Sequence, residues 1–212
     1  MKQRTCQILY AYWNEVRGQR VAPHRFEIEP ARIASILPET FILERIDTTN
    51  YRFRLAGTRI CEQFGVEFRG TNFLDLWTAR DRHTLERQLS NITEHGAVGV
   101  LNFEVSTADH RSIQFEVVLL PLVHTATSVN RLLGAMSAVE TPPWLGTERL
   151  QAPRLLRHEL NWPDGRLRTR LETTHRQEPF APQMRGARFV KVDRRQFRVY
   201  EGGLAQGERD KP

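Results

Sequence analysis

The hydrophobic positions near the start of the chain repeat with the period of a helix. Leu9, Trp13 and Val16 fall on one stripe within residues 5–17, whereas polar side chains such as Asn14 lie between them. This pattern is typical of an amphipathic helix, and the glycine at position 18 is a suitable end point because it readily adopts the left-handed conformation that follows a helix. We therefore expect a leading helix with one apolar face.

A short helix over residues 30–37 and two strands are predicted next. Residues 40–46, with the sequence TFILERI, are predicted to form a first strand, and apolar and polar residues alternate from residue 51, where Tyr51, Phe53 and Leu55 are separated by arginines. Alternation of this kind is typical of strands with one buried face. The intervening sequence Asp-Thr-Thr-Asn has the composition of a turn, so the two strands should pair antiparallel.

The alternation stops at Gly57, and helical spacing takes over. Ile60 and Phe64 define a short helix, the segment 72–77 follows it, and a longer helix runs from Thr78 to a glycine stop at position 96. Three further strands are then predicted in succession, over residues 101–106, 112–122 and 131–139, and the first two alternate clearly at their start. Strand pairs at both ends with all helical pieces between them predict an α+β fold, a five-stranded antiparallel sheet with helices on one face.

The character of the chain changes near residue 141, where prolines and arginines become frequent. Residues 1–148 contain 16 basic and 17 acidic residues, a net charge of −1, whereas residues 149–212 contain 15 and 8, a net charge of +7. The basic balance of the whole chain therefore belongs to its last third. We expect an N-terminal helical segment (1–38), a core (39–140) and a basic C-terminal extension (141–212), in which residues 187–192 and 196–203 are candidates for short strands.

The order of strands and helices resembles that of a PAS domain, and eight short phrases resemble a bacterial family of small stand-alone PAS proteins. The resemblance extends from about residue 9 to residue 146 and implies a signalling module that senses a small molecule or docks a partner, not an enzyme. The phrases are YW (12–13), ILPETFILE (36–44), YRFRLAGT (51–58), CEQFGVEFRG (61–70), LW (76–77), FEVVLLPL (115–122), RLLGAMS (131–137) and WLG (144–146).

A curved PAS sheet and its covering helices would enclose a pocket lined by the inward side chains. Concave, mainly apolar sites with a few polar groups are typical of ligand binding, but the same residues can simply pack against one another as core. Both readings stay open from the sequence. The candidate pocket residues are Phe53, Leu55, Ile60, Phe64, Phe73, Trp77, Leu85, Leu89, Phe103, Phe115 and Val117.

Two further surfaces are candidates for partner binding. The leading helix is unusually aromatic, and Leu9, Tyr12, Trp13 and Val16 would form a homodimer or partner interface, unless Trp13 faces its own sheet. In the basic extension, alternating arginines on a strand could contact phosphates or an acidic protein, although nothing resembles a sequence-specific DNA-binding motif. These arginines are Arg166, Arg168, Arg170, Arg194, Arg195 and Arg198.

Cofactor and catalytic chemistry find little support in the sequence, and no cofactor can be named. Cys61 lacks the flanking residues of flavin-binding photoreceptor PAS domains, and His83 and His95 stand at the ends of the long predicted helix, where a haem ligand is not expected. Cys6 and Cys61 are expected to be reduced thiols of a cytoplasmic protein. The motifs of hydrolases, metalloproteases and nucleotide-binding folds do not occur, and no stretch is apolar enough to insert in a membrane.

The sequence therefore predicts a non-catalytic, cytoplasmic PAS sensor or regulatory protein of signal transduction, which binds a small ligand or a protein partner. The alternative is a PAS scaffold without a ligand that binds protein or nucleic acid through its basic extension.

Overall fold

The computed structural model describes residues 1–124 and 128–164, and its elements follow the predicted order with one addition at the end. The elements are α1 (Arg4–Arg17), η1 (Arg25–Glu27), η2 (Pro30–Glu39), β1 (Thr40–Arg45), β2 (Tyr51–Ala56), α2 (Thr58–Phe64), η3 (Phe73–Leu76), α3 (Ala79–His95), β3 (Val98–Ser106), β4 (Ser112–Val123), β5 (Val129–Ala138) and β6 (Gln151–Asn161). The fold is α+β, as predicted. The predicted helix at residues 30–37 is a 3₁₀ helix that is longer by two residues and kinked at Ile33.

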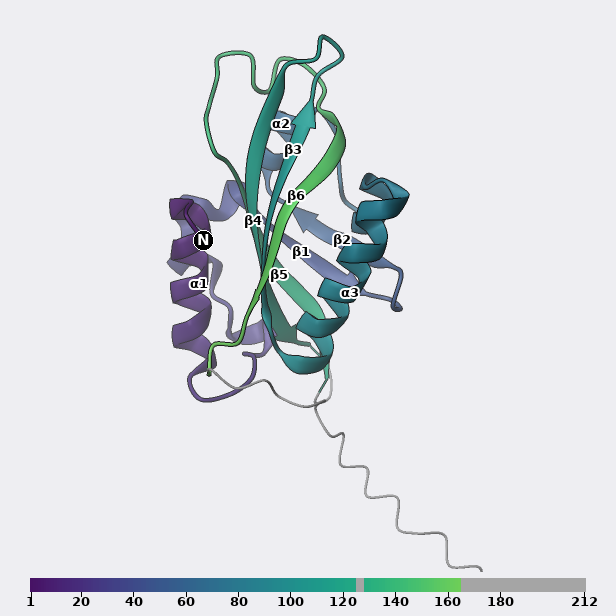
Figure 1. The fold of residues 1–212 in the computed structure, drawn as a ribbon. Coiled ribbons are helices and arrows are strands. Elements are labelled where there is room, and N and C mark those ends of the chain that lie inside the picture. Colours follow the sequence, from purple (N-terminus) through teal and green to yellow (C-terminus); the bar gives the residue numbers. More distant parts are fainter. Residues whose placement is uncertain (125–127, 165–212) are drawn as a thin grey trace, which may run out of the picture. The chain divides into compact units, whose positions relative to one another are not determined.

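The strands form one antiparallel sheet in the order β2-β1-β5-β4-β3-β6. Strands β1 and β2 pair as neighbours in sequence, as do β3, β4 and β5 in turn, while β1 and β5 pair in the middle and so bring the two halves of the chain together (Figure 1). Gly134 of β5 allows this central pairing, since a Cβ atom there would come within 2.2 Å of the Phe41 ring on β1.

The sixth strand corrects the prediction of five strands. Strand β6 pairs with β3 along most of its length, although it lies within the segment that the sequence marks as a basic extension. Most of its residues are exposed or half-buried, so its sequence lacks the clean alternation that identifies a strand with one buried face. The candidate strands at 187–192 and 196–203 lie outside the described residues.

Helices lie on both faces of the sheet, with α1 on one side and α3 on the other (Figure 1). Helix α3 begins at Thr78, whose side chain accepts a hydrogen bond from the Asp81 amide, and ends at Gly96 in the left-handed conformation, as the sequence predicts. Helix α1 packs on β4 and β5 from the opposite side. The core is therefore split into two layers, one between the sheet and α3 and one between the sheet and α1.

The joint at Gly57 has a steric cause. The backbone there is extended, with φ −67°, so a left-handed conformation is not the reason for glycine. Instead, a Cβ atom at this position would lie 2.3 Å from the carbonyl oxygen of Pro38. The close approach of the η2 backbone requires glycine where β2 gives way to α2, and this fixes α2 over the sheet.

Candidate functional site

The space between the sheet and the α2–α3 layer contains a continuous cluster of aromatic rings. The rings of Phe64 and Phe115 are 5.2 Å apart, those of Phe103 and Phe115 are stacked at 5.5 Å, and Trp77 meets Phe103 edge-on at 5.2 Å. Such separations are those of rings in favourable contact. We call this the ring cluster, and its members are Phe41, Phe53, Phe64, Phe68, Phe73, Trp77, Phe103 and Phe115.

The structure brings ten of the eleven predicted pocket residues into this interior. All ten are less than 9% exposed, and they come from β2, α2, η3, α3, β3 and β4. They are Phe53, Ile60, Phe64, Phe73, Trp77, Leu85, Leu89, Phe103, Phe115 and Val117.

The prediction for Leu55 is wrong, because this side chain is 46% exposed. Leu43 pairs with Phe53 but Ile42 pairs with Leu55, so Arg54 is an extra residue in β2. A bulge of this kind shifts the alternation by one residue. Leu55 is thereby turned out of the interior, although its spacing from Phe53 predicts the inner face.

Two members of the ring cluster escape the sequence analysis. Phe41 lies on β1 and contacts Phe53 at 5.6 Å, and Phe68 lies between α2 and η3 and contacts Phe53 at 5.1 Å. Phe68 stands in an irregular segment bounded by two glycines, where no period identifies a buried side chain. Phe41 stands in a run of three apolar residues with Ile42 and Leu43, where no alternation identifies the buried face.

Two buried polar atoms border the aromatic interior without a hydrogen-bond partner among the described residues, Trp77 Nε1 and Gln63 Oε1. The buried hydroxyl of Tyr51 lies beside Thr93 and Ser90. Burial raises the pKa of Tyr51, which the nearby Thr93 partly opposes. A buried donor or acceptor without a partner costs about 1–3 kcal/mol, so Trp77 Nε1 and Gln63 Oε1 are the places in the interior where a polar group of a ligand would gain most.

The ring cluster itself is closely packed. Two depressions in the described part of the chain, one of them small, are lined by other residues and include none of the eleven predicted pocket residues. The larger, with a volume of about 530 Å³, is open to solvent between Asn50, Arg52 and residues 70–76. At the predicted pocket, the rings of the described residues lie in contact with one another, as the side chains of a core do.

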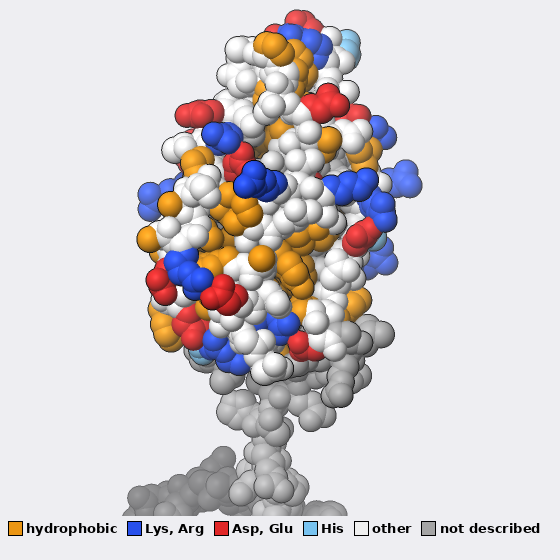
Figure 2. Space-filling view, turned by 90° about the vertical axis from the view of Figure 1, so that its left-hand side faces the viewer, with side chains coloured by type: hydrophobic (Ala, Val, Ile, Leu, Met, Phe, Trp, Pro, Cys, Tyr) orange, Lys and Arg blue, Asp and Glu red, His pale blue; other side chains and the backbone are white. Residues whose placement is uncertain are grey.

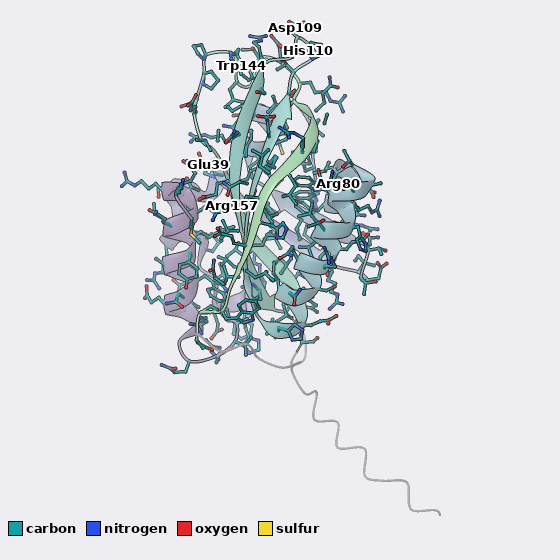
Figure 3. The ribbon with its side chains drawn as sticks, viewed as in Figure 1. Glu39, Arg80, Asp109, His110, Trp144 and Arg157 are labelled. Atoms are coloured by element: carbon teal, nitrogen blue, oxygen red, sulfur yellow. The ribbon has the colours of Figure 1, made fainter. Side chains whose placement is uncertain are left out.

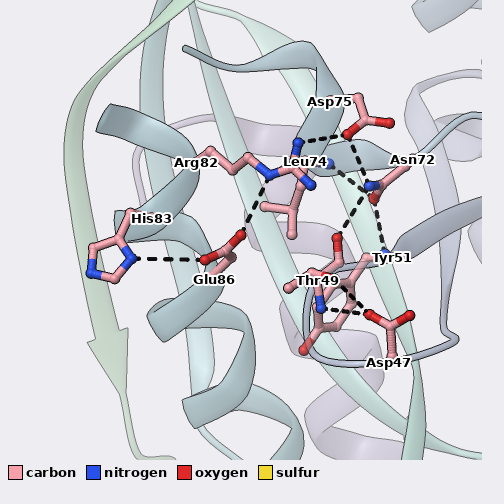
Figure 4. A network of polar contacts seen from close by, with 9 residues as sticks. All are labelled: Asp47, Thr49, Tyr51, Asn72, Leu74, Asp75, Arg82, His83 and Glu86. Carbon is pink, nitrogen blue, oxygen red and sulfur yellow. Dashed lines mark hydrogen bonds and ion pairs between the residues drawn. The ribbon is translucent and has the colours of Figure 1, made fainter. Parts of the chain in front are cut away.

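Asn72 and Asp75, which line the larger depression, are engaged with each other and with Arg82 (Figure 4). Asn72 accepts hydrogen bonds at Oδ1 from the amides of Tyr51 and Leu74, at 2.9 and 3.2 Å, and donates from Nδ2 to Asp75 at 3.1 Å. Arg82 pairs with Asp75 at 2.8 Å. This network fixes η3 and the start of α3 to β2.

The opposite face of the sheet holds the first residues of the chain. The carboxylate of Glu116, only 2% exposed, accepts hydrogen bonds from the main-chain amides of Lys2 and Gln3 at 2.8–2.9 Å. A carboxylate at this end of α1 also complements the helix dipole. Cys6 lies beside Glu116, and burial together with that negative charge raises the pKa of its thiol.

The apolar stripe of α1 is turned toward the chain's own sheet, which corrects its assignment to a partner surface. Leu9 and Trp13 are fully buried and Tyr12 is 7% exposed. Of the four predicted interface residues, Val16 alone is half-buried. Figure 2 faces this side and shows hydrophobic side chains along its middle among scattered charged ones.

Loops meet at one end of the sheet, beyond the β3–β4 turn. The Arg111 guanidinium lies 5.1 Å from the centre of the Trp144 ring and pairs with Glu148. Figure 3 shows Trp144, Asp109 and His110 together at this end. The segment WLG (144–146) therefore packs against the β3–β4 turn through the contact of Trp144 with Arg111.

The residues considered for cofactors are dispersed. Cys61 is a half-buried free thiol on α2, and Cys6 is a buried free thiol on α1. His83 is 74% exposed beside Glu86, and His95 lies in the last turn of α3. In the described part of the chain no three His, Cys, Asp or Glu side chains gather as a metal site would require. The arginines at 166, 168, 170, 194, 195 and 198 lie outside the described residues.

No helix among residues 1–124 and 128–164 combines the length and hydrophobicity needed to cross a bilayer.

A family model described as a PAS domain matches residues 1–137. Among solved structures, the chain is similar to the PAS domain of an HTR-like protein from Haloarcula marismortui, with 18% identity and a TM-score of 0.36 over 54% of this chain and 95% of that one. No curated protein matches the chain.

Proposed function

This chain belongs to the PAS domain family, and from that premise we propose that it is a non-catalytic regulatory protein of signal transduction. Its binding of a small ligand or a protein partner would change the packing of the helices on the sheet. The two free thiols, one of them fully buried, support a reducing compartment such as the cytoplasm.

The observation that carries the proposal is the aromatic interior with its unpartnered polar atoms. A ligand that hydrogen-bonds Trp77 Nε1 or Gln63 Oε1 would satisfy a group that otherwise has no partner among the described residues. Because the rings are closely packed, such a ligand would have to select an arrangement in which α2 or the segment before α3 has moved. Preferential binding to one arrangement shifts the population toward it.

The sheet offers a route from the interior to the leading helix. Phe115 and Val117 of β4 face the ring cluster, while Glu116 between them holds the amides of Lys2 and Gln3 on the other face. Adjacent residues of a strand move together, since they share one backbone. A displacement of β4 by a ligand would therefore change how α1 packs on the sheet. A downstream partner would act on α1.

The alternative, a PAS scaffold that functions without a ligand, is favoured by one observation. The aromatic rings of the described interior are in contact with one another, and the two depressions are lined by other residues. In that case binding of protein or nucleic acid would rely on residues 149–212, whose net charge is +7.

Native mass spectrometry and an absorbance scan of the freshly purified full chain test the two proposals. The ligand proposal expects a non-covalent adduct that is lost or weakened in Trp77→Phe, because phenylalanine keeps a ring but removes the N–H donor. Trp144→Phe is the matched control and should retain the adduct, since the Trp144 ring lies against the Arg111 guanidinium at the end of the sheet.

A chain without an adduct would contradict the ligand proposal. The scaffold proposal would then be tested by a mobility shift with nucleic acid at low salt. That shift should disappear when residues 165–212 are deleted and persist for the intact chain.

A further inference from the structure

The two edges of the sheet differ in how their backbone groups are covered. At the β2 edge, Phe53 exchanges main-chain hydrogen bonds with Gly70 and Thr71, at 2.8 and 2.9 Å. These bonds occupy the outer side of β2 as a further strand would. At the other edge lies β6, which Figure 1 shows in front of the other strands with α1 and α3 to either side.

The register of β3 shows which groups of β6 point outward. Thr107 donates from its amide to the carbonyl of Arg111 at 2.9 Å, so main-chain groups of the odd-numbered residues of β3 face β4 and those of the even-numbered residues face β6. Arg157 and Glu159 pair with the even-numbered Asn102 and Val100. The main-chain groups of Arg157 and Glu159 therefore face β3. Those of the alternate residues His158 and Leu160 point away from the sheet.

The first half of β6 is protected, whereas the second half is not. The Leu155 amide, which also points away from β3, donates to the Asp81 carboxylate of α3 at 3.0 Å. The outward groups of His158 and Leu160 have no such partner among the described residues. Unpaired edges of this kind accept another strand.

We propose that the second half of β6 pairs antiparallel with the same segment of a second copy of this chain, around a two-fold axis at His158. In this register Arg157 of each copy lies opposite Glu159 of the other. Both side chains are on the α1 face, because their partners Asn102 and Val100 lie on that face. Directly opposite side chains of unlike charge stabilise an antiparallel pair.

Neighbouring registers are less suitable. An axis at Arg157 places two arginines opposite each other, and an axis at Glu159 does the same with two glutamates. The axis at His158 also puts Leu156, which is 40% exposed, opposite Leu160 of the second copy. Within one chain Arg157 and Glu159 form an ion pair with each other. In the dimer each of these side chains would pair with its opposite across the axis instead, so no charge is left unpaired.

Charge exchange tests this arrangement by light scattering and sedimentation of the full chain over a concentration series. The wild-type chain should dimerise, whereas Arg157→Glu and Glu159→Arg should each be monomeric, because like charges then face each other across the axis. Mixing the two variants should restore a dimer, since each Glu of one then meets an Arg of the other.

The matched control is Arg52→Glu on the covered β2 edge, which should dimerise as the wild type does. Circular dichroism of each variant reports whether it is folded, and recovery on mixing cannot arise from misfolded chains. A monomeric wild-type chain would overturn the proposal and assign the edge to another segment of the chain or to a different partner. Single variants that dimerise, or a mixture that stays monomeric, would overturn it as well. None of these outcomes depends on a ligand in the ring cluster.

Discussion

The indole Nε1 of Trp13 donates a hydrogen bond to the carbonyl oxygen of Pro121 at 2.9 Å, across the interface between α1 and the sheet. Pro121 lies inside β4 rather than ending it, two residues beyond Leu119, where pairing with β3 stops. The missing N–H of proline is thus on the side where no β3 partner needs it, and its carbonyl is free to hold α1.

Replacement of Trp13 should destabilise the chain without changing its association. Trp13→Ala removes a fully buried side chain, which costs about 3–5 kcal/mol. Trp13→Phe keeps most of the ring and loses the hydrogen bond, so its cost should be smaller, on the order of 1–3 kcal/mol. Urea unfolding measures both. A change in molar mass at an unchanged free energy of unfolding would instead place Trp13 at a partner interface.

The Glu116 carboxylate should hold the start of α1 in place. Glu116→Ala removes the acceptor of the Lys2 and Gln3 amides. A hydrogen bond to a charged group contributes about 1.5–3 kcal/mol to the free energy of unfolding. We expect lower stability and faster amide exchange in the first turn of α1. Glu104→Ala, which removes only an ion pair with the exposed Arg154, is the control and should have little effect. Equal rates of amide exchange in the first turn of α1 for the two variants would contradict this role of Glu116.

The residues that sequence analysis placed correctly are those whose periodicity is uninterrupted. Thr78 and Gly96 bound α3, and alternation in β3 and β4 puts Phe103, Phe115 and Val117 inside. The failures occur where one residue breaks the period. The extra residue Arg54 turns Leu55 outward.

Strand β6 escapes prediction for a different reason, since an exposed edge strand has little need of an apolar face. The contacts of Trp13 could not be predicted either. An apolar helix stripe fits the chain's own sheet and a partner equally well, and only the position of Pro121 distinguishes the two.

Gly134 and Phe41 should be energetically coupled. Gly134→Ala would place a methyl group 2.2 Å from the buried Phe41 ring, and overpacking of this kind costs about 1–3 kcal/mol. Phe41→Leu removes ring atoms at the point of collision. The double variant should therefore be more stable than the sum of the two single costs predicts, by about 0.5–3 kcal/mol. Additive costs in urea unfolding would show that the ring moves aside freely.

Alkaline pH should destabilise the fold through Cys6. Burial, followed by the charge of Glu116, raises the pKa of this thiol in the folded chain above its ordinary value of 9.0. Above that pH the unfolded chain has lost the thiol proton and the folded chain keeps it. The unfolded state then binds fewer protons, so the free energy of unfolding falls as pH rises, by up to about 1.4 kcal/mol per pH unit.

The stability contributed by protonated Cys6 is thus fully present below pH 9.0 and is lost progressively above it. Urea unfolding at several pH values should give a shallower alkaline slope for Cys6→Ala than for the wild type. The matched variant Cys61→Ala keeps Cys6 and should keep the wild-type slope. Burial of Tyr51 acts in the same direction at higher pH, because its pKa is also raised. The comparison is therefore clearest just above pH 9, and identical slopes there for wild type and Cys6→Ala would contradict a buried, neutral thiol.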